Sequence, residues 1–437
     1  MFNKKNTTQI IKETKKVADP TKKHTWWSFG KRKIDTAFGM SISDSSIELL
    51  EFRPFFTHKP CSYSRVSLEA GIVSRGKIVD RNLLLEKAKQ LLVSAKPGKV
   101  STNHVILSLP EEQVFTWSIA LNKSISGSEL KAKIFEEARK VIPLDFKKIY
   151  WDFVVYPLKQ KELQYVTFVG IHQEILNEYV NVCNDLGLEI VDFSLESMNL
   201  ARVFLPPSDS DDYVLLDIGG DTSTISILGG NRLLKLSFTI PIAGAALTKA
   251  ISTSMNVTLL EAEQLKIKFG ISDGPGPSYK NAVESVLNDL LKQVNDAISY
   301  YEKNSAETVD AIYLTGGSSL LSGIDSYVAK ITNKKIQTLA SLPFIVKSPI
   351  FSKEINLKLF AAAVGLALMG ISQDYKILSF RKQILINSSK PGCIRKIKSG
   401  YFSTFKMIFS PAHVTYGILI LLIVGLTTIF TLMWLSL

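Results

Sequence analysis

The chain has 437 residues, enough for two or three domains, and 46% of them are hydrophobic, which is ample for buried cores. Of its net charge of +12, residues 1–33 and residues 375–412 carry +8 each, which leaves −4 for the body between them. This distribution argues against nucleic-acid binding and favours a membrane surface. The three scattered cysteines show no metal-ligand spacing and indicate a reducing compartment. The five scattered histidines show no catalytic cluster.

The first 33 residues are Lys-rich and polar, which predicts a basic, disordered arm. The arm ends in an aromatic and basic cluster at 24–33, which would either lie on anionic lipid or cover the first strand of the domain. From Ala37 the pattern predicts two strands, 37–42 and 47–52, joined by a short polar loop at 43–46.

Residues 111–200 have their own pattern of elements. They alternate as strand, helix, strand, strand, helix and strand, at 114–121, 128–141, 150–157, 165–171, 173–186 and 189–193. We therefore predict a small α+β subdomain, ending with the 189–193 strand, inserted within the first half of the chain.

The segment 213–238 has the features of an anion-binding hairpin. A short apolar strand at 214–216 runs into Asp217-Ile218-Gly219-Gly220-Asp221-Thr222, and two further strands follow at 225–227 and 233–238. Paired glycines let the backbone approach an anion, and its N–H groups with the Thr222 hydroxyl could surround phosphate oxygens. Asp217 could hold the water shell of Mg²⁺. The same string would also suit an ordinary tight turn.

A second strand-to-glycine motif lies about a hundred residues later. Residues 310–315 form an apolar strand that leads into Gly316-Gly317-Ser318 and then into a helical pattern. Between the two motifs, Glu263 and Lys266 stand three residues apart on one helix face, which by itself would be an ordinary solvated salt bridge.

The order of these motifs resembles that of the actin-like ATPases, and several stretches are similar to the PilM family of type IV pilus proteins within its FtsA branch. The resemblance covers residues 34–372 and rests on 108–111, 136–144, 151–153, 217–220, 261–266, 314–317 and 363–368. It implies an α/β actin-like fold with two lobes around a nucleotide cleft, whose glycine turns, Gly219 and Gly316, lie at one crevice.

The resemblance also implies ATP and Mg²⁺ as cofactors. The expected nucleotide-binding residues come from two phosphate loops, an adenosine loop and a ribose-contacting helix: Ser43, Ser45, Asp217, Gly219, Gly220, Thr222, Glu263, Lys266, Gly316, Gly317 and Ser318. Ser41 stands where the superfamily normally has an aspartate that organises magnesium. Without that carboxylate, metal-assisted hydrolysis loses a major contributor, so we expect at most a slow ATPase.

Two apolar stretches near the C-terminus call for opposite interpretations. Residues 360–371 are apolar nearly all round but too short to span, which predicts a buried domain helix. Residues 414–437 are uncharged and would span roughly 36 Å as a helix, which predicts a transmembrane anchor in place of a buried soluble helix. The basic residues before it place the body in the cytosol, at the cytoplasmic membrane, and the C-terminus across the bilayer.

The predicted organisation is a basic arm (1–33), a first lobe (34–110), the inserted subdomain (111–200), a second lobe whose last helix returns to the first (201–373), a basic linker (374–412) and a membrane helix (413–437). PilM-family members bind the cytosolic peptide of a membrane protein, PilN, and residues 374–437 either replace such a partner or only anchor the chain. Self-association is left open.

We therefore expect an ATP-binding scaffold of a type IV pilus, or a related secretion or DNA-uptake platform, whose nucleotide state controls partner binding. The alternative is an FtsA-like, membrane-tethered cytoskeletal ATPase. Rapid phosphate release would favour the second.

Overall fold

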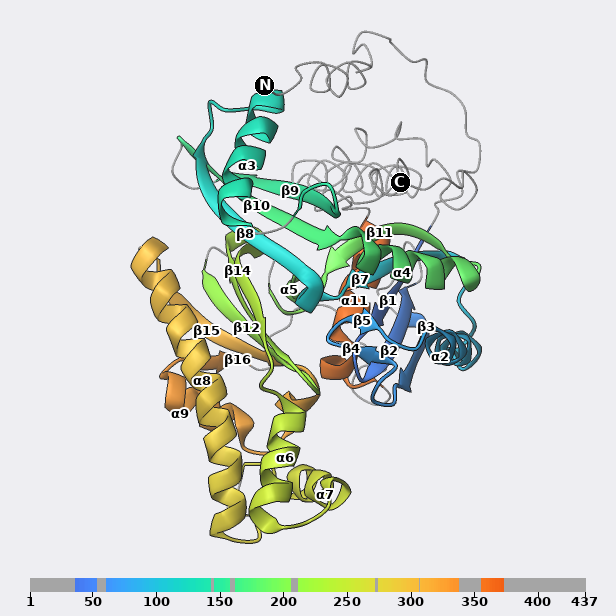
Figure 1. Ribbon diagram of the computed structural model, residues 1–437, viewed down its shortest axis with the longest axis vertical. Helices are drawn as coiled ribbons and strands as arrows, with labels where there is room; N and C mark the ends of the chain where they lie inside the picture. The colour runs from blue at the N-terminus through green and yellow to red at the C-terminus, as the bar shows by residue number, and fades with distance from the viewer. Residues whose placement is uncertain are drawn as a thin grey trace, which may run out of the picture. The chain divides into compact units, whose positions relative to one another are not determined.

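The computed structural model describes residues 36–52, 60–142, 145–157, 162–205, 211–271, 274–305, 307–337 and 355–372 (Figure 1). The predicted arm at 1–33, the linker at 374–412 and the membrane span at 414–437 lie outside these residues. Within the described ranges, no helix combines the length and the apolar character that crossing a bilayer requires.

The first lobe is built on a six-stranded sheet with the order β11-β7-β1-β2-β3-β6. Its strands are β1 (Phe38–Ile42), β2 (Ser46–Phe52), β3 (Pro60–Ser67), β6 (Lys96–Pro97), β7 (His104–Leu109) and β11 (Glu189–Leu195). The antiparallel meander β1-β2-β3 is extended on the other side of β1 by the parallel strands β7 and β11. Helix α2 (Arg81–Val93) and a short hairpin of β4 (Val73–Ser74) and β5 (Lys77–Ile78) connect β3 to β6.

The second lobe repeats this topology in a five-stranded sheet with the order β14-β13-β12-β15-β16. Its strands are β12 (Asp212–Ile218), β13 (Ser223–Gly229), β14 (Leu233–Ile240), β15 (Val309–Thr315) and β16 (Lys335–Gln337). Here too an antiparallel meander, β12-β13-β14, is followed by two parallel strands on the far side of the first. Two lobes with one connectivity confirm the predicted actin-like architecture.

Four helices accompany the second sheet: α6 (Gly244–Met255), α7 (Leu259–Phe269), α8 (Pro277–Ser305) and α9 (Ile324–Thr332) (Figure 1). One face of α8 is apolar, and its residues Leu287, Leu291 and Val294 are buried in one core with the strand residues Val214 and Ile227. A regular 3–4 spacing of apolar residues places them on one side of a helix, and that side is the one that packs on the sheet.

The inserted sheet has three strands, in the order β8 (Val114–Asn122), β10 (Leu163–His172) and β9 (Ile149–Pro157), with α3 (Gly127–Val141). It has a separate apolar core in which the Trp151 and Phe168 rings stack 5.6 Å apart. The prediction that the 189–193 strand belongs to this subdomain is wrong. That strand is β11, and its backbone pairs with β7 of the first lobe.

Helix α11 (Leu357–Ser372) follows the second lobe but packs on the first, against α5 (Glu196–Phe204), β1, β2 and β7. The approach is very close, because a Cβ atom at Gly39 would lie only 2.5 Å from the carbonyl oxygen of Ala363. The structure thus confirms that the apolar 360–371 stretch is a buried domain helix that returns to the first lobe.

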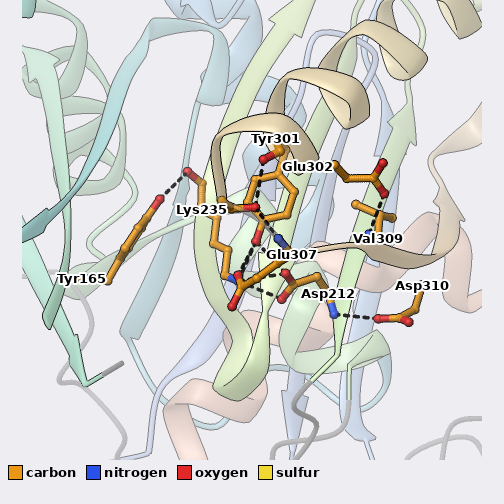
Figure 2. A network of polar contacts seen from close by, with 9 residues as sticks. Tyr165, Asp212, Lys235, Tyr301, Glu302, Glu307, Val309 and Asp310 are labelled. Carbon is orange, nitrogen blue, oxygen red and sulfur yellow. Dashed lines mark hydrogen bonds and ion pairs between the residues drawn. The ribbon is translucent and has the colours of Figure 1, made fainter. Parts of the chain in front are cut away.

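The inserted sheet contacts the second lobe along the edge strand β14. Three hydroxyl groups donate hydrogen bonds to its backbone carbonyls: Thr116 to Ser237 (3.1 Å), Thr167 to Leu234 (2.9 Å) and Tyr165 to Lys235 (3.4 Å; Figure 2). An edge strand leaves unpaired carbonyl groups, and these hydroxyls satisfy some of them.

Candidate functional site

Three loops that follow β1, β12 and β15 meet in the structure. We call residues 43–45, 219–222 and 316–318 the loop junction. The first two loops face each other, since a Cβ atom at Gly220 would lie 3.6 Å from the Ser45 Cβ. The second and third are joined by a hydrogen bond from the Ser318 hydroxyl to the Gly219 carbonyl (3.0 Å). The prediction that the glycine turns lie together is confirmed.

The first loop is shaped by side chains that bond to its own backbone. The Ser43 hydroxyl donates to the Ser46 carbonyl and accepts from the Ser46 N–H, both at 3.1 Å. Asp44 accepts hydrogen bonds from the N–H groups of Arg75 (2.5 Å) and Gly76 (3.0 Å). Ser45 is left exposed opposite the second loop. Ser43 is therefore committed to the loop, and Ser45 carries its accessible hydroxyl.

The second loop is held between a tight turn and the start of α6. The Gly219 N–H donates to the Thr222 carbonyl at 3.0 Å. From the first residues of α6, Gly244 N–H donates to the Gly219 carbonyl (3.2 Å) and Ala245 N–H to the Gly220 carbonyl (2.7 Å). The helix N-terminus carries a partial positive charge, so this loop lies where an anion is favoured.

The third loop depends on a glycine conformation. Gly316 has φ +83° and ψ 168°, which only glycine adopts readily, while Gly317 is exposed and has open space where a side chain would be. Just before it, the Thr315 hydroxyl donates to the half-buried Asp217 carboxylate at 2.6 Å. Thr315 thereby joins the third loop to the strand end that carries the predicted Mg²⁺ residue.

The predicted pair on α7 forms and turns inward. The helix begins with a capping box of Thr258 and Glu261, and Glu263 lies 2.6 Å from the Lys266 ammonium group. Lys266 is only 6% exposed and donates to the Gly244 carbonyl at 3.1 Å. It is therefore not part of a solvated surface salt bridge, because it links α7 to the start of α6 beside the loop junction.

The sequence motifs did not reveal a group of carboxyl side chains around Asp217. Glu48 on β2, Glu111 on the short 3-10 helix η1 (Glu111–Gln113) and Glu196 at the start of α5 each interact with the Asp217 charge, and Glu112 on η1 interacts with Glu196. Loss of hydration raises the pKa of each of these groups and of Asp217, and mutual repulsion adds to the effect at Glu196.

A sequence signal could have identified Glu196. It directly follows β11, which runs parallel to β7 and β1, so it lies at the sheet edge where the carboxyl ends of these strands meet and where the first loop also lies.

Within the described residues, no group of three or more His, Cys, Asp or Glu side chains has a metal-binding arrangement. Mg²⁺ coordination through Asp217 stays a prediction.

The raised pKa values lead to a pH prediction. A carboxyl group whose pKa is higher in the folded state favours folding while it is protonated and loses that contribution as pH rises. The free protein should therefore gain thermal stability as pH falls from about 8 to about 6. Thermal unfolding of wild type and a Glu196→Gln variant measures this, and the variant should show a smaller slope. Equal slopes would contradict the assignment to Glu196.

Comparison with known proteins places this geometry in a family. The family described as "Type IV pilus assembly protein PilM" matches residues 39–371. The chain belongs to the PilM family. Apart from Phe38, the residues that match the PilM family contain both sheets, the inserted subdomain, the loop junction and nearly all of α11.

Curated relatives of this PilM-family chain include the cell division protein FtsA. FtsA of Buchnera aphidicola (subsp. Schizaphis graminum) is 30% identical over 227 residues, which cover 44% of this chain and 54% of the relative. FtsA of Neisseria meningitidis serogroup B is 26% identical over 199 residues, covering 39% and 48%. The chain spans about half the length of the curated relatives it matches.

A solved "PilM-PilN type IV pilus biogenesis complex" has the same fold. It superposes with a TM-score of 0.65 and 21% identity, covering 78% of this chain and 99% of that one. The fold of that complex is thus shared over most of this PilM-family chain.

Proposed function

We propose that this chain is a nucleotide-binding scaffold of a type IV pilus assembly platform, or of a related secretion or DNA-uptake platform. The observation that carries the proposal is the loop junction, where two glycine turns from one lobe meet a serine loop from the other beside a helix N-terminus. Backbone N–H groups, small residues and a helix dipole are the means by which proteins bind phosphate groups.

The residues fit ATP in distinct roles. Ser45, the Gly219–Gly220 backbone and Thr222 would bind phosphates, Gly316, Gly317 and Ser318 the adenosine, and Glu263 with Lys266 the ribose. Mg²⁺ would neutralise phosphate charge, and Asp217 would hold it through water. Ser41 is 3% exposed and carries no carboxylate, so hydrolysis would lack one electrostatic contributor and turnover would be slow.

The two lobes would bind a peptide partner and be tethered to a membrane. A PilN-like peptide, or residues 374–437 of the chain itself, would bind the lobes, and the affinity for this peptide would depend on the nucleotide state. The 414–437 helix would anchor the protein in the cytoplasmic membrane with the body in the cytosol. The PilM–PilN complex supports the first part, and the charge distribution of the sequence supports the second.

A second candidate is an FtsA-like, membrane-tethered ATPase. The 30% identity to Buchnera FtsA favours it. The two candidates differ in turnover and in self-association, because a cytoskeletal ATPase hydrolyses nucleotide as it assembles, whereas a scaffold needs only to bind.

The test uses the full-length protein in detergent, titrated calorimetrically with ATP with and without Mg²⁺, followed by a phosphate-release assay. We expect Mg²⁺-dependent ATP binding with negligible turnover. Asp217→Asn should weaken ATP binding at least about tenfold with Mg²⁺ present and less without it. The control is Asp296→Asn on the exposed side of α8, which should bind like wild type. A wild-type protein that does not bind ATP would refute the proposal, and rapid phosphate release would favour the FtsA-like candidate.

A further inference from the structure

The short helix η1 connects the first lobe to the inserted subdomain and touches the second lobe at the loop junction. Glu111 accepts hydrogen bonds from the Ser197 N–H and from the Ser237 hydroxyl on β14, both at 2.8 Å. The Gln113 amide donates to the Arg75 carbonyl at 2.7 Å. These bonds fix η1 from three sides, so the residue between them, Glu112, is held in a defined place.

The two carboxylate oxygens of Glu112 have unequal surroundings. Oε1 accepts a hydrogen bond from the Thr222 hydroxyl in the second loop. Oε2 is buried and has no hydrogen-bond partner among the described residues. A buried carboxylate oxygen without a donor is unfavourable. Loss of hydration raises the pKa of Glu112, and repulsion from Asp44 and Asp221 adds to the rise, whereas the Thr222 hydrogen bond and Arg75 oppose it.

Glu112 therefore accepts the hydrogen bond of Thr222, the hydroxyl that a bound phosphate would need. The Thr222 hydroxyl has a single proton and can donate either to the carboxylate or to a phosphate oxygen. In addition, two anions within a few ångströms repel each other strongly where water is largely excluded. Binding of a phosphate at the second loop must then displace Glu112 or work against its charge.

We infer that Glu112 competes with the phosphate groups of the bound nucleotide for Thr222 and so lowers the affinity of this protein for phosphorylated nucleotides relative to the bare nucleoside. The inference rests on the proposed nucleotide site and names a residue that sets its selectivity. The opposite role is also chemically reasonable, since the unpaired Oε2 could hold the water shell of Mg²⁺. The two roles predict opposite signs for removal of the charge.

The decisive variant is Glu112→Gln, which keeps the shape of the side chain and removes its charge. Full-length wild type and variant are titrated calorimetrically with ATP, ADP and adenosine at one salt concentration, both with and without Mg²⁺. We expect the variant to bind ATP and ADP about tenfold more tightly, equivalent to about 1.4 kcal/mol, and adenosine with unchanged affinity. Adenosine is the internal control because it has no phosphate for Glu112 to exclude.

A matched control separates this effect from general removal of negative charge. Asp221→Asn neutralises an exposed carboxylate in the second loop, next to Thr222. Solvent screening should limit its gain in ATP affinity to less than about threefold. If Glu112→Gln does not fold, Glu112→Asp keeps the charge but shortens the reach to Thr222, and it should give a smaller gain for ATP and ADP and none for adenosine.

Each outcome is decisive. Tighter ATP and ADP binding with unchanged adenosine binding supports the inference. Unchanged or weaker ATP binding in the variant, while wild type binds ATP, overturns it and leaves the proposed function standing. A Mg²⁺-dependent loss would assign Glu112 to the metal. If neither protein binds ATP, both the inference and the proposed function fail.

Discussion

A Gly316→Ala variant should lose nucleotide binding and about 3 kcal/mol of folding free energy. Gly316 has φ +83°, and a Cβ atom there would clash with the Ile218 carbonyl and lie 2.7 Å from an Asp217 carboxylate oxygen. The backbone of β12 cannot move away without breaking its pairing with β15, and so the loop must distort. The distortion falls on the residues that join the third loop to the second.

The neighbouring residue provides a matched control. Gly317 has open space where its Cβ atom would be, so Gly317→Ala should leave stability within about 0.5 kcal/mol of wild type. Urea unfolding and ATP titration of both variants check the pair. Equal stability of the two alanine variants would show that the Gly316 conformation is not required, and intact ATP affinity in Gly316→Ala would remove the third loop from the proposed site.

The second large effect is expected at Lys235 on the edge strand β14. Its side chain is 7% exposed, and its ammonium group contacts Asp212 and the Tyr301 hydroxyl at 2.9 and 2.7 Å, as well as Glu307 (Figure 2). Tyr301 in turn donates to Asp212 at 2.6 Å. Lys235→Met leaves a buried carboxylate without its counter-ion, which should cost about 3–5 kcal/mol.

The sign of the charge effect can be tested by pH and by a second substitution. Burial already raises the pKa of Asp212, so the loss in Lys235→Met should be larger at about pH 8 than at about pH 5, where more of the unpaired carboxyl is protonated. Adding Asp212→Asn should recover part of the loss because no buried charge then remains unpaired. Lys249→Met, on the exposed side of α6, is the control and should change little. Additive losses in the double variant would contradict a charge-pairing role.

Many elements could be predicted from local patterns. The strands predicted at 165–171 and 214–216 and the helix predicted at 128–141 correspond to β10, β12 and α3 within a few residues of their bounds, because the spacing of apolar residues follows from backbone geometry. The two glycine pairs likewise identified the turns, since their residue types restrict the backbone locally. Family resemblance, and not periodicity, indicated that these turns belong to one site.

Other features depend on contacts between distant segments. The assignment of the 189–193 strand to the first lobe is set by its pairing with β7, and no local pattern distinguishes one sheet from another. Similarly, Glu112 is an ordinary glutamate in sequence and becomes a competitor for phosphate only because η1 places it against Thr222, 110 positions away.

From the amino-acid sequence alone, the order and type of many elements and the glycine turns could be established, since each depends on neighbouring residues. The missing carboxylate at Ser41 was identified only through the resemblance to the actin-like ATPases. Which carboxyl groups surround Asp217, and that Lys266 turns inward, became clear only from the folded chain. The physical reason is that burial and the distances between charges depend on how distant segments pack against one another. The local preferences of the residues do not determine that packing.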